Sequence, residues 1–148
     1  MKAGRGAAER SLRRSIRSCL TEVDVVCGEI RALLEAAGYA AACFSVELAT
    51  RECLCNAVIH GNRCDPEKAV HMDLRIGRRW IRLDVADEGA GFNWRRERKT
   101  PRDETISDGR GLAIYARYAR RIAFNRRGNR VTLWIEKPKG GRACLTTS

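Results

Sequence analysis

The sequence predicts an α+β protein, a two-layer sandwich with helices on one face of a mostly antiparallel sheet. Two observations lead to this prediction. Two segments in the first half carry apolar side chains at helical spacing, and four later segments alternate apolar and polar side chains as half-buried strands do. The four strands come in two pairs joined by short turns, and such pairs are antiparallel neighbours in a sheet.

The helices are expected over residues 22–37 and 44–61, with a third, shorter helix over residues 112–118. Apolar residues recur every three or four positions in the first segment, and Gly38 follows as a stop signal. The second segment is largely apolar but carries a stripe of polar side chains. A buried helix keeps such a stripe only where something meets it.

The first hairpin is expected over residues 70–76 and 81–85, around a turn at Gly77-Arg78. The second hairpin spans residues 121–136 and turns at residues 127–129. The sheet face away from the helices would carry Trp80 and Trp134 among charged residues. Such exposed aromatic side chains either mark a partner surface or are simply solvated, and the sequence leaves both interpretations open.

The length of 148 residues predicts one domain, here placed at residues 18–138, between a basic N-terminal tail (residues 1–17) and a C-terminal tail (residues 139–148). The basic tail has no apolar block typical of a secretion signal, although an organellar transit peptide is an alternative interpretation. No apolar run approaches the roughly 20 residues of a membrane span. Seven scattered cysteines indicate a reducing compartment, so we expect a cytoplasmic protein.

The net charge of +11 raises the question of nucleic-acid binding. Basic residues occur in several separate segments, and no recognition helix, zinc finger or aromatic RNA-binding motif accompanies them. The sequence therefore argues against nucleic acid as a partner. A solvated basic surface or an acidic protein partner is the favoured interpretation.

Three polar residues of the second helix, Glu52, Asn56 and His60, are spaced four apart. At about 100° per residue they fall on an arc of roughly 80°, so they project from one side of the helix. Two glycine-rich turns follow in the sequence, and turns of this kind let the backbone approach a phosphate or a base. Their sequences are Asp87-Glu88-Gly89-Ala90-Gly91 and Gly109-Arg110-Gly111-Leu112. Together the three elements predict a nucleotide site.

Residues 93–108 lack apolar periodicity, are rich in charged side chains and contain Pro101. Long loops of this kind inside a domain are often functional, so we expect a lid that nucleotide orders.

With these three motifs in this order, the chain resembles the GHKL ATPase superfamily, and within it the serine-protein kinases that act as anti-sigma factors. The resemblance covers about residues 20–137 and implies the histidine-kinase-like, or Bergerat, ATPase fold. It also implies ATP and Mg²⁺ as cofactors. A threonine that many members place before the last strand to hold the adenine is not found at that point, and Thr132 is out of register with it.

The resemblance also implies roles for the motif residues. Asn56 corresponds to the Mg²⁺ ligand, Glu52 to the general base that takes the proton of the attacking hydroxyl, and Asp87 to the carboxylate that accepts the adenine amino proton. Gly89 and Gly91 would let the chain pass close to the base. The turn at Gly109, Arg110, Gly111 and Leu112 would wrap the phosphates. His60 either contacts a phosphate or is a satisfied helix-end histidine.

The implied function is an Mg-ATP-dependent serine/threonine protein kinase that acts as an anti-sigma factor. Its partners would be a sigma factor and a STAS-domain anti-sigma factor antagonist, which it would phosphorylate, and it would form a homodimer. Two alternatives remain open at this point. One is a nucleotide-responsive regulatory module without phosphotransfer, and the other is a basic nucleic-acid-associated protein.

Overall fold

The computed structural model describes residues 10–93 and 112–139. The elements in chain order are β1 (Arg10–Arg17), α1 (Leu20–Ala36), a 3₁₀ turn (Ala40–Ala42), α2 (Cys43–Asn56), a π-helical turn (Ala57–Gly61), β2 (Ala69–Ile76), β3 (Trp80–Asp87), α4 (Leu112–Tyr118), β4 (Arg121–Phe124) and β5 (Arg130–Glu136). The predicted helices and both hairpins are confirmed, with bounds shifted by one or two residues.

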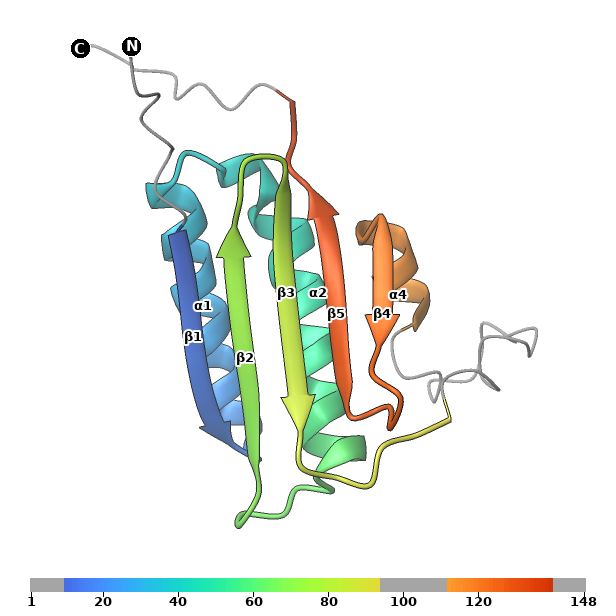
Figure 1. Cartoon of the computed structure of the whole chain (residues 1–148). Helices are drawn as coiled ribbons and strands as arrows, with labels where there is room; N and C mark the ends of the chain where they lie inside the picture. The colour runs from blue at the N-terminus through green and yellow to red at the C-terminus, as the bar shows by residue number, and fades with distance from the viewer. Residues whose placement is uncertain (1–9, 94–111, 140–148) are drawn as a thin grey trace, which may run out of the picture.

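The five strands form one antiparallel sheet in the order β1-β2-β3-β5-β4. The helices all lie behind this sheet in Figure 1, and the other face is open toward the viewer. The predicted α+β two-layer sandwich, with helices on one face, is confirmed.

The core lies between the sheet and helices α1 and α2. In register across the sheet run five apolar residues, one from each strand: Leu12, Leu74, Leu83, Leu133 and Ile122. Fully buried side chains of the helices pack against the sheet, among them Ile30, Leu34, Val46 and Leu54. Burial of such side chains supplies most of the free energy that holds the two layers together.

The prediction that residues 1–17 form a tail is wrong for residues 10–17, which are strand β1. This strand pairs with β2 along its full length, from Arg10 opposite Ile76 to Arg17 opposite Ala69. Its arginines hid the strand pattern, because only Leu12 and Ile16 contribute apolar side chains to the core. The inward position between them is Arg14, whose guanidinium reaches Glu29 of α1 at 2.9 Å. Charge on an edge strand also discourages pairing with other chains.

The second predicted helix changes its hydrogen-bonding pattern before it ends. After Asn56 the backbone widens into a π-helical turn, in which the N–H of Asn62 donates to the carbonyl oxygen of Ala57 at 2.8 Å. Arg63 and Cys64 then adopt left-handed backbone angles, with φ of 55° and 56°. π-Turns inside helices often occur at functional sites. Here the turn carries His60 and Gly61 to the end of β3.

The open face carries the two tryptophans as predicted, and both are half-buried. The guanidinium of Arg79 lies 5.1 Å from the Trp80 ring, and those of Arg82 and Arg121 lie 5.6 and 4.5 Å from the Trp134 ring. No helix in the described ranges has the length and apolar content that a membrane crossing needs. The six cysteines in these ranges are all free thiols.

Candidate functional site

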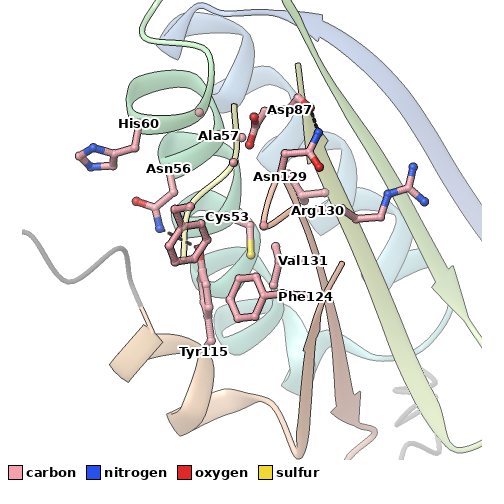
Figure 2. Close-up of a pocket in the computed structure, with 15 residues that line it drawn as sticks. Cys53, Asn56, Ala57, His60, Asp87, Tyr115, Phe124, Asn129, Arg130 and Val131 are labelled. Atoms are coloured by element: carbon pink, nitrogen blue, oxygen red, sulfur yellow. Dashed lines mark hydrogen bonds between the residues drawn. The ribbon is translucent and has the colours of Figure 1, made fainter. Parts of the chain in front are cut away.

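A pocket opens where the end of α2 and its π-turn meet the end of β3, helix α4 and the β4–β5 turn (Figure 2). Its lining includes Asn56, His60, Asp87 and Gly91 from the predicted motifs. The other lining residues are Cys53, Ala57, Gly61, Val85, Phe92, Tyr115, Phe124, Gly128, Asn129, Arg130 and Val131. The fold thus brings the helix stripe and the first glycine-rich turn, about 30 residues apart in sequence, to one place.

Asp87 is the last residue of β3, and its backbone is fixed from both sides. Its N–H donates to the carbonyl oxygen of Asn129 at 2.9 Å, and its own carbonyl oxygen accepts from Asn129 Nδ2 at 2.9 Å. The carboxylate oxygen Oδ1 accepts the N–H of Gly89 at 2.8 Å. These bonds set the direction of the carboxylate, which Figure 2 shows beside the helix end.

Glycines are required where the chain segments around Asp87 touch. A Cβ on Gly61 would overlap the Asp87 carboxylate, and a Cβ on Gly89 would overlap the carbonyl oxygen of Gly61. The backbone of the π-turn therefore lies directly against the turn after β3. Gly91 and Gly128 have φ of 81° and 79°, which side chains rarely tolerate. The contacts seen here are between protein segments, so the predicted role of Gly89 and Gly91, a close approach of the chain to the base, stays a prediction.

Asn62 was missed by the sequence reasoning and holds this junction together. Its side chain is 1% exposed. Oδ1 accepts the N–H of Glu88 at 2.8 Å, and Nδ2 donates to Ala69 O at 2.8 Å and to Ser18 Oγ at 3.0 Å. Asn62 thus joins the helix end to the turn that carries Asp87, to β2 and to the β1–α1 junction. An asparagine directly after a helix-ending His-Gly pair was the only available signal.

Asn56 is held by helix α4. Its Nδ2 donates to the hydroxyl oxygen of Tyr115 at 2.7 Å. In Figure 2 the carboxamide oxygen points to the opposite side, toward His60. Tyr115 is 3% exposed, and burial raises the pKa of its phenol well above the ordinary value. Burial likewise raises the pKa of the neighbouring Cys53 thiol to about 12, so both groups are neutral lining of the pocket.

The three residues of the predicted stripe do not play equal parts in the pocket. Asn56 and His60 line it, whereas Glu52 does not. Glu52 lies one turn earlier on α2, half-buried, just outside the lining. Within the described ranges, no three metal-binding carboxylate, imidazole or thiol side chains lie together.

Several predicted site residues lie outside the described part of the chain. These are Gly109, Arg110 and Gly111, together with the predicted lid except for Asn93. Leu112 begins α4 as the motif predicts. The expected roles of these residues in phosphate binding and closure stay predictions.

Thr132 does not replace the missing adenine-side threonine. It lies on β5 opposite Asp84, and its hydroxyl donates to Asp84 Oδ1 at 2.5 Å on the open face of the sheet. The pocket face at this point is formed by Val131, next to Asn129 and the Phe92–Phe124 pair. These two rings meet edge to face, with centroids 5.4 Å apart. An apolar wall with a single carboxylate at its end is suited to a purine ring.

The pocket has a volume of about 40 Å³ in this structure. Ligand sites typically have several hundred Å³, so a ligand of nucleotide size needs a wider pocket than this structure shows.

A model of the histidine kinase-like ATPase domain matches residues 16–135, most of the chain. The chain belongs to this family. The match covers the pocket and every described element except most of β1 and the last residue of β5. Membership implies that the protein binds ATP.

The ATPase domain is also similar to the serine/threonine-protein kinase BtrW of Bordetella bronchiseptica. The two are 29% identical over 96 residues, which cover 61% of this chain and 68% of the kinase. The family match and this similarity agree on a histidine kinase-like ATPase domain.

Proposed function

We propose that the protein is an Mg-ATP-dependent serine/threonine protein kinase of the anti-sigma-factor type. The observation that carries the proposal is the pocket itself, in which Asp87 and Asn56 face one cavity from different elements. The kinship with BtrW, which is named a serine/threonine-protein kinase, supports transfer to a protein hydroxyl.

The two residues suit opposite ends of ATP. The Asp87 carboxylate accepts hydrogen bonds only, and the adenine amino group donates them, so this residue would read the base. Asn56 lies on the helix away from the wall formed by Val131 and Phe124, at the end where the phosphates would lie. His60 lines the same side and would contact a phosphate.

The carboxamide oxygen of Asn56 is also a suitable ligand for Mg²⁺. This ion prefers oxygen ligands, keeps several waters and is commonly held by one or two protein groups plus substrate phosphates. One carboxamide oxygen, that of Asn56, therefore suffices, and a cage of several acidic residues is not required. When bound, the ion neutralises charge on the β- and γ-phosphates.

Glu52 would act as the general base. It lies one turn before Asn56 and outside the pocket lining, on a part of α2 that bound ATP need not cover. The serine or threonine oxygen would form a bond to the γ-phosphorus as the bond from that phosphorus to the β–γ bridging oxygen breaks. ADP would leave with this oxygen, and the hydroxyl proton would pass to Glu52.

The proposed substrate is a STAS-domain anti-sigma factor antagonist, and the proposed second partner is a sigma factor, with the kinase acting as a homodimer in the cytoplasm. The competing proposal is a regulatory module in which ATP only orders residues 93–108. Hydrogen exchange in that segment would slow on ATP addition under either proposal, so phosphotransfer has to decide.

The experiment compares Glu52→Ala, Asn56→Ala and Glu47→Ala in calorimetry with Mg-ATP and in transfer of labelled γ-phosphate to STAS-domain proteins. Glu47 is a matched control, because it lies on α2 but pairs with Arg31 away from the pocket. Glu52→Ala should lose transfer and keep binding, Asn56→Ala should lose both, and Glu47→Ala neither. A wild type that binds ATP without any transfer would favour the regulatory module. One that binds no nucleotide at millimolar concentration would refute both proposals.

A further inference from the structure

A hollow of about 400 Å³ lies on the open face of the sheet, and we call it the sheet hollow. This face is the one opposite the helices in Figure 1. Arg13, Arg75, Arg82 and Arg130 stand around it, and Asp73 and Asp84 lie at its middle. The sheet hollow is larger than the nucleotide pocket and shares one lining residue with it, Arg130. The guanidinium of Arg130 points away from the nucleotide pocket in Figure 2, and the proposed phosphotransfer does not use it.

The sheet hollow carries more positive charge than its own acids neutralise. Arg13 and Arg75 share one carboxylate oxygen, Asp73 Oδ2, at 3.1 and 2.9 Å. Arg82 pairs with Asp84 at 3.0 Å, and the exposed Arg130 has no ion pair within the described ranges. Four guanidiniums therefore surround two carboxylates.

The helix side of the protein has a different charge pattern. There Arg14 pairs with Glu29, Arg31 with Glu47 and Arg51 with Asp24, each with its own acid. Among the ion pairs compared here, arginines outnumber acids in the sheet hollow and not on the helix side. Arg79 and Arg120 also share one acid, Glu136, but these residues lie outside the sheet hollow. An anionic partner is the chemistry that this imbalance fits.

The sheet register sets the spacing of the charges. Arg75 lies directly opposite Arg82, and Asp73 directly opposite Asp84. Arg130 lies opposite Ala86, four residues along β3 from Arg82. At roughly 3.3 Å per residue, the two arginine positions are roughly 13 Å apart, the span of side chains i and i+4 of an extended peptide.

Asp73 and Asp84 make the middle of the sheet hollow unfavourable for a further negative charge and favourable for a hydrogen-bond donor. The side chain of Asp73 is 19% exposed, and its buried Oδ1 has no hydrogen-bond donor within the described ranges. The Arg82 and Arg121 guanidiniums cover Trp134, which leaves its ring poorly placed to stack on a base. A phosphodiester chain offers negative charge without donors, whereas a peptide offers carboxylates, hydroxyls and N–H groups.

We propose that the sheet hollow binds an extended acidic segment of another protein, with carboxylates at positions i and i+4 and a small donor side chain at i+2. The carboxylates meet the Arg75–Arg82 pair and Arg130, and the donor side chain meets Asp73. A second copy of this chain would oppose arginine-rich faces to each other, so it fits the charges less well.

The probe is a fluorescent peptide of repeated Glu-Ala-Ser-Ala units, titrated with the full-length protein and followed by anisotropy. Its control has the same composition with the glutamates adjacent. Arg82→Glu/Arg130→Glu should weaken binding of the probe about tenfold or more. Arg31→Glu/Arg51→Glu, which changes net charge equally on the helix side, should leave it within about twofold.

Equal losses in the two double variants would overturn the proposal, since they would show that net charge alone attracts the peptide. So would equal affinity for the control peptide, or no binding of the probe. Tighter binding of an oligothymidine that Arg82→Glu/Arg130→Glu abolishes would show a nucleic-acid surface instead. Arg130→Ala repeats the test should the double variant not fold, because this exposed side chain has no ion pair in the described part of the chain. About threefold weaker binding is expected.

Discussion

Replacement of Asn62 by alanine should weaken both the fold and the nucleotide site. The substitution removes three hydrogen bonds, of 2.8, 2.8 and 3.0 Å, and leaves the N–H of Glu88 and the carbonyl oxygen of Ala69 without their partner. An orphaned buried polar group costs about 1–3 kcal/mol. Both groups are partly buried, so water regains some of this loss, and we expect the free energy of unfolding to fall by about 2–3 kcal/mol.

The same variant should bind ATP about tenfold more weakly. Glu88 is the residue after Asp87, and without the bond from its N–H the turn that directs the Asp87 carboxylate loses its link to the helix end. Ser18→Ala is the matched control, because it removes one Asn62 contact and the bond from Ser18 to the Lys68 carbonyl oxygen but leaves the bond between Asn62 and Glu88 intact. We expect Ser18→Ala to cost about 1–2 kcal/mol and to bind ATP normally.

Urea unfolding and calorimetry with Mg-ATP measure the two quantities. The reasoning would be refuted if Asn62→Ala lost stability yet bound ATP as the wild type does. In that case Asn62 would support the fold without positioning Asp87. Equal loss of affinity in the Ser18→Ala variant would also contradict it, since the effect would then follow from general destabilisation.

Three further predictions concern the pocket. Gly61→Ala should lower ATP affinity more than Asp87→Asn, because the added methyl group displaces the carboxylate and the backbone beside it, and calorimetry would show the order. Tyr115→Phe should raise the Mg²⁺ concentration needed for half-maximal ATP binding, since Asn56 loses the bond that orients its carboxamide; an unchanged Mg²⁺ titration would contradict this. Stability should fall as pH rises above about 9, because burial raises the pKa of Cys53 to about 12 in the folded state while the unfolded thiol ionises at its ordinary pKa. Cys53→Ala should reduce that dependence in urea unfolding at pH about 8 and about 10. The part that remains comes from other groups whose pKa burial raises, namely Cys27 (to about 11), Cys43, Cys55 and Tyr115.

The sequence by itself determined the helices α1 and α2 and the two hairpins. It also determined which face of each helix and strand is buried in the core. These features follow from local periodicity, since alternate strand residues and every third or fourth helix residue must face the core. It also pointed to Asn56, His60, Asp87 and the glycines as one site. The side chains of Asn56, His60 and Asp87 offer groups that suit a nucleotide and its metal ion. Glycines are typical of places where backbone segments approach closely, and this holds without knowledge of the fold.

The remaining features depended on contacts between distant segments. Strand β1 is a strand because its two apolar residues pair with β2 and its inward arginine meets Glu29, and neither partner is near it in sequence. Asn62 gains its importance from three partners on separate elements, and Thr132 faces away from the pocket because the β3–β5 register places it opposite Asp84. The sheet hollow has the same origin. Its arginines are scattered over four strands, and pairing of those strands sets their spacing and gives Arg130 no acidic partner among the residues that the structure describes.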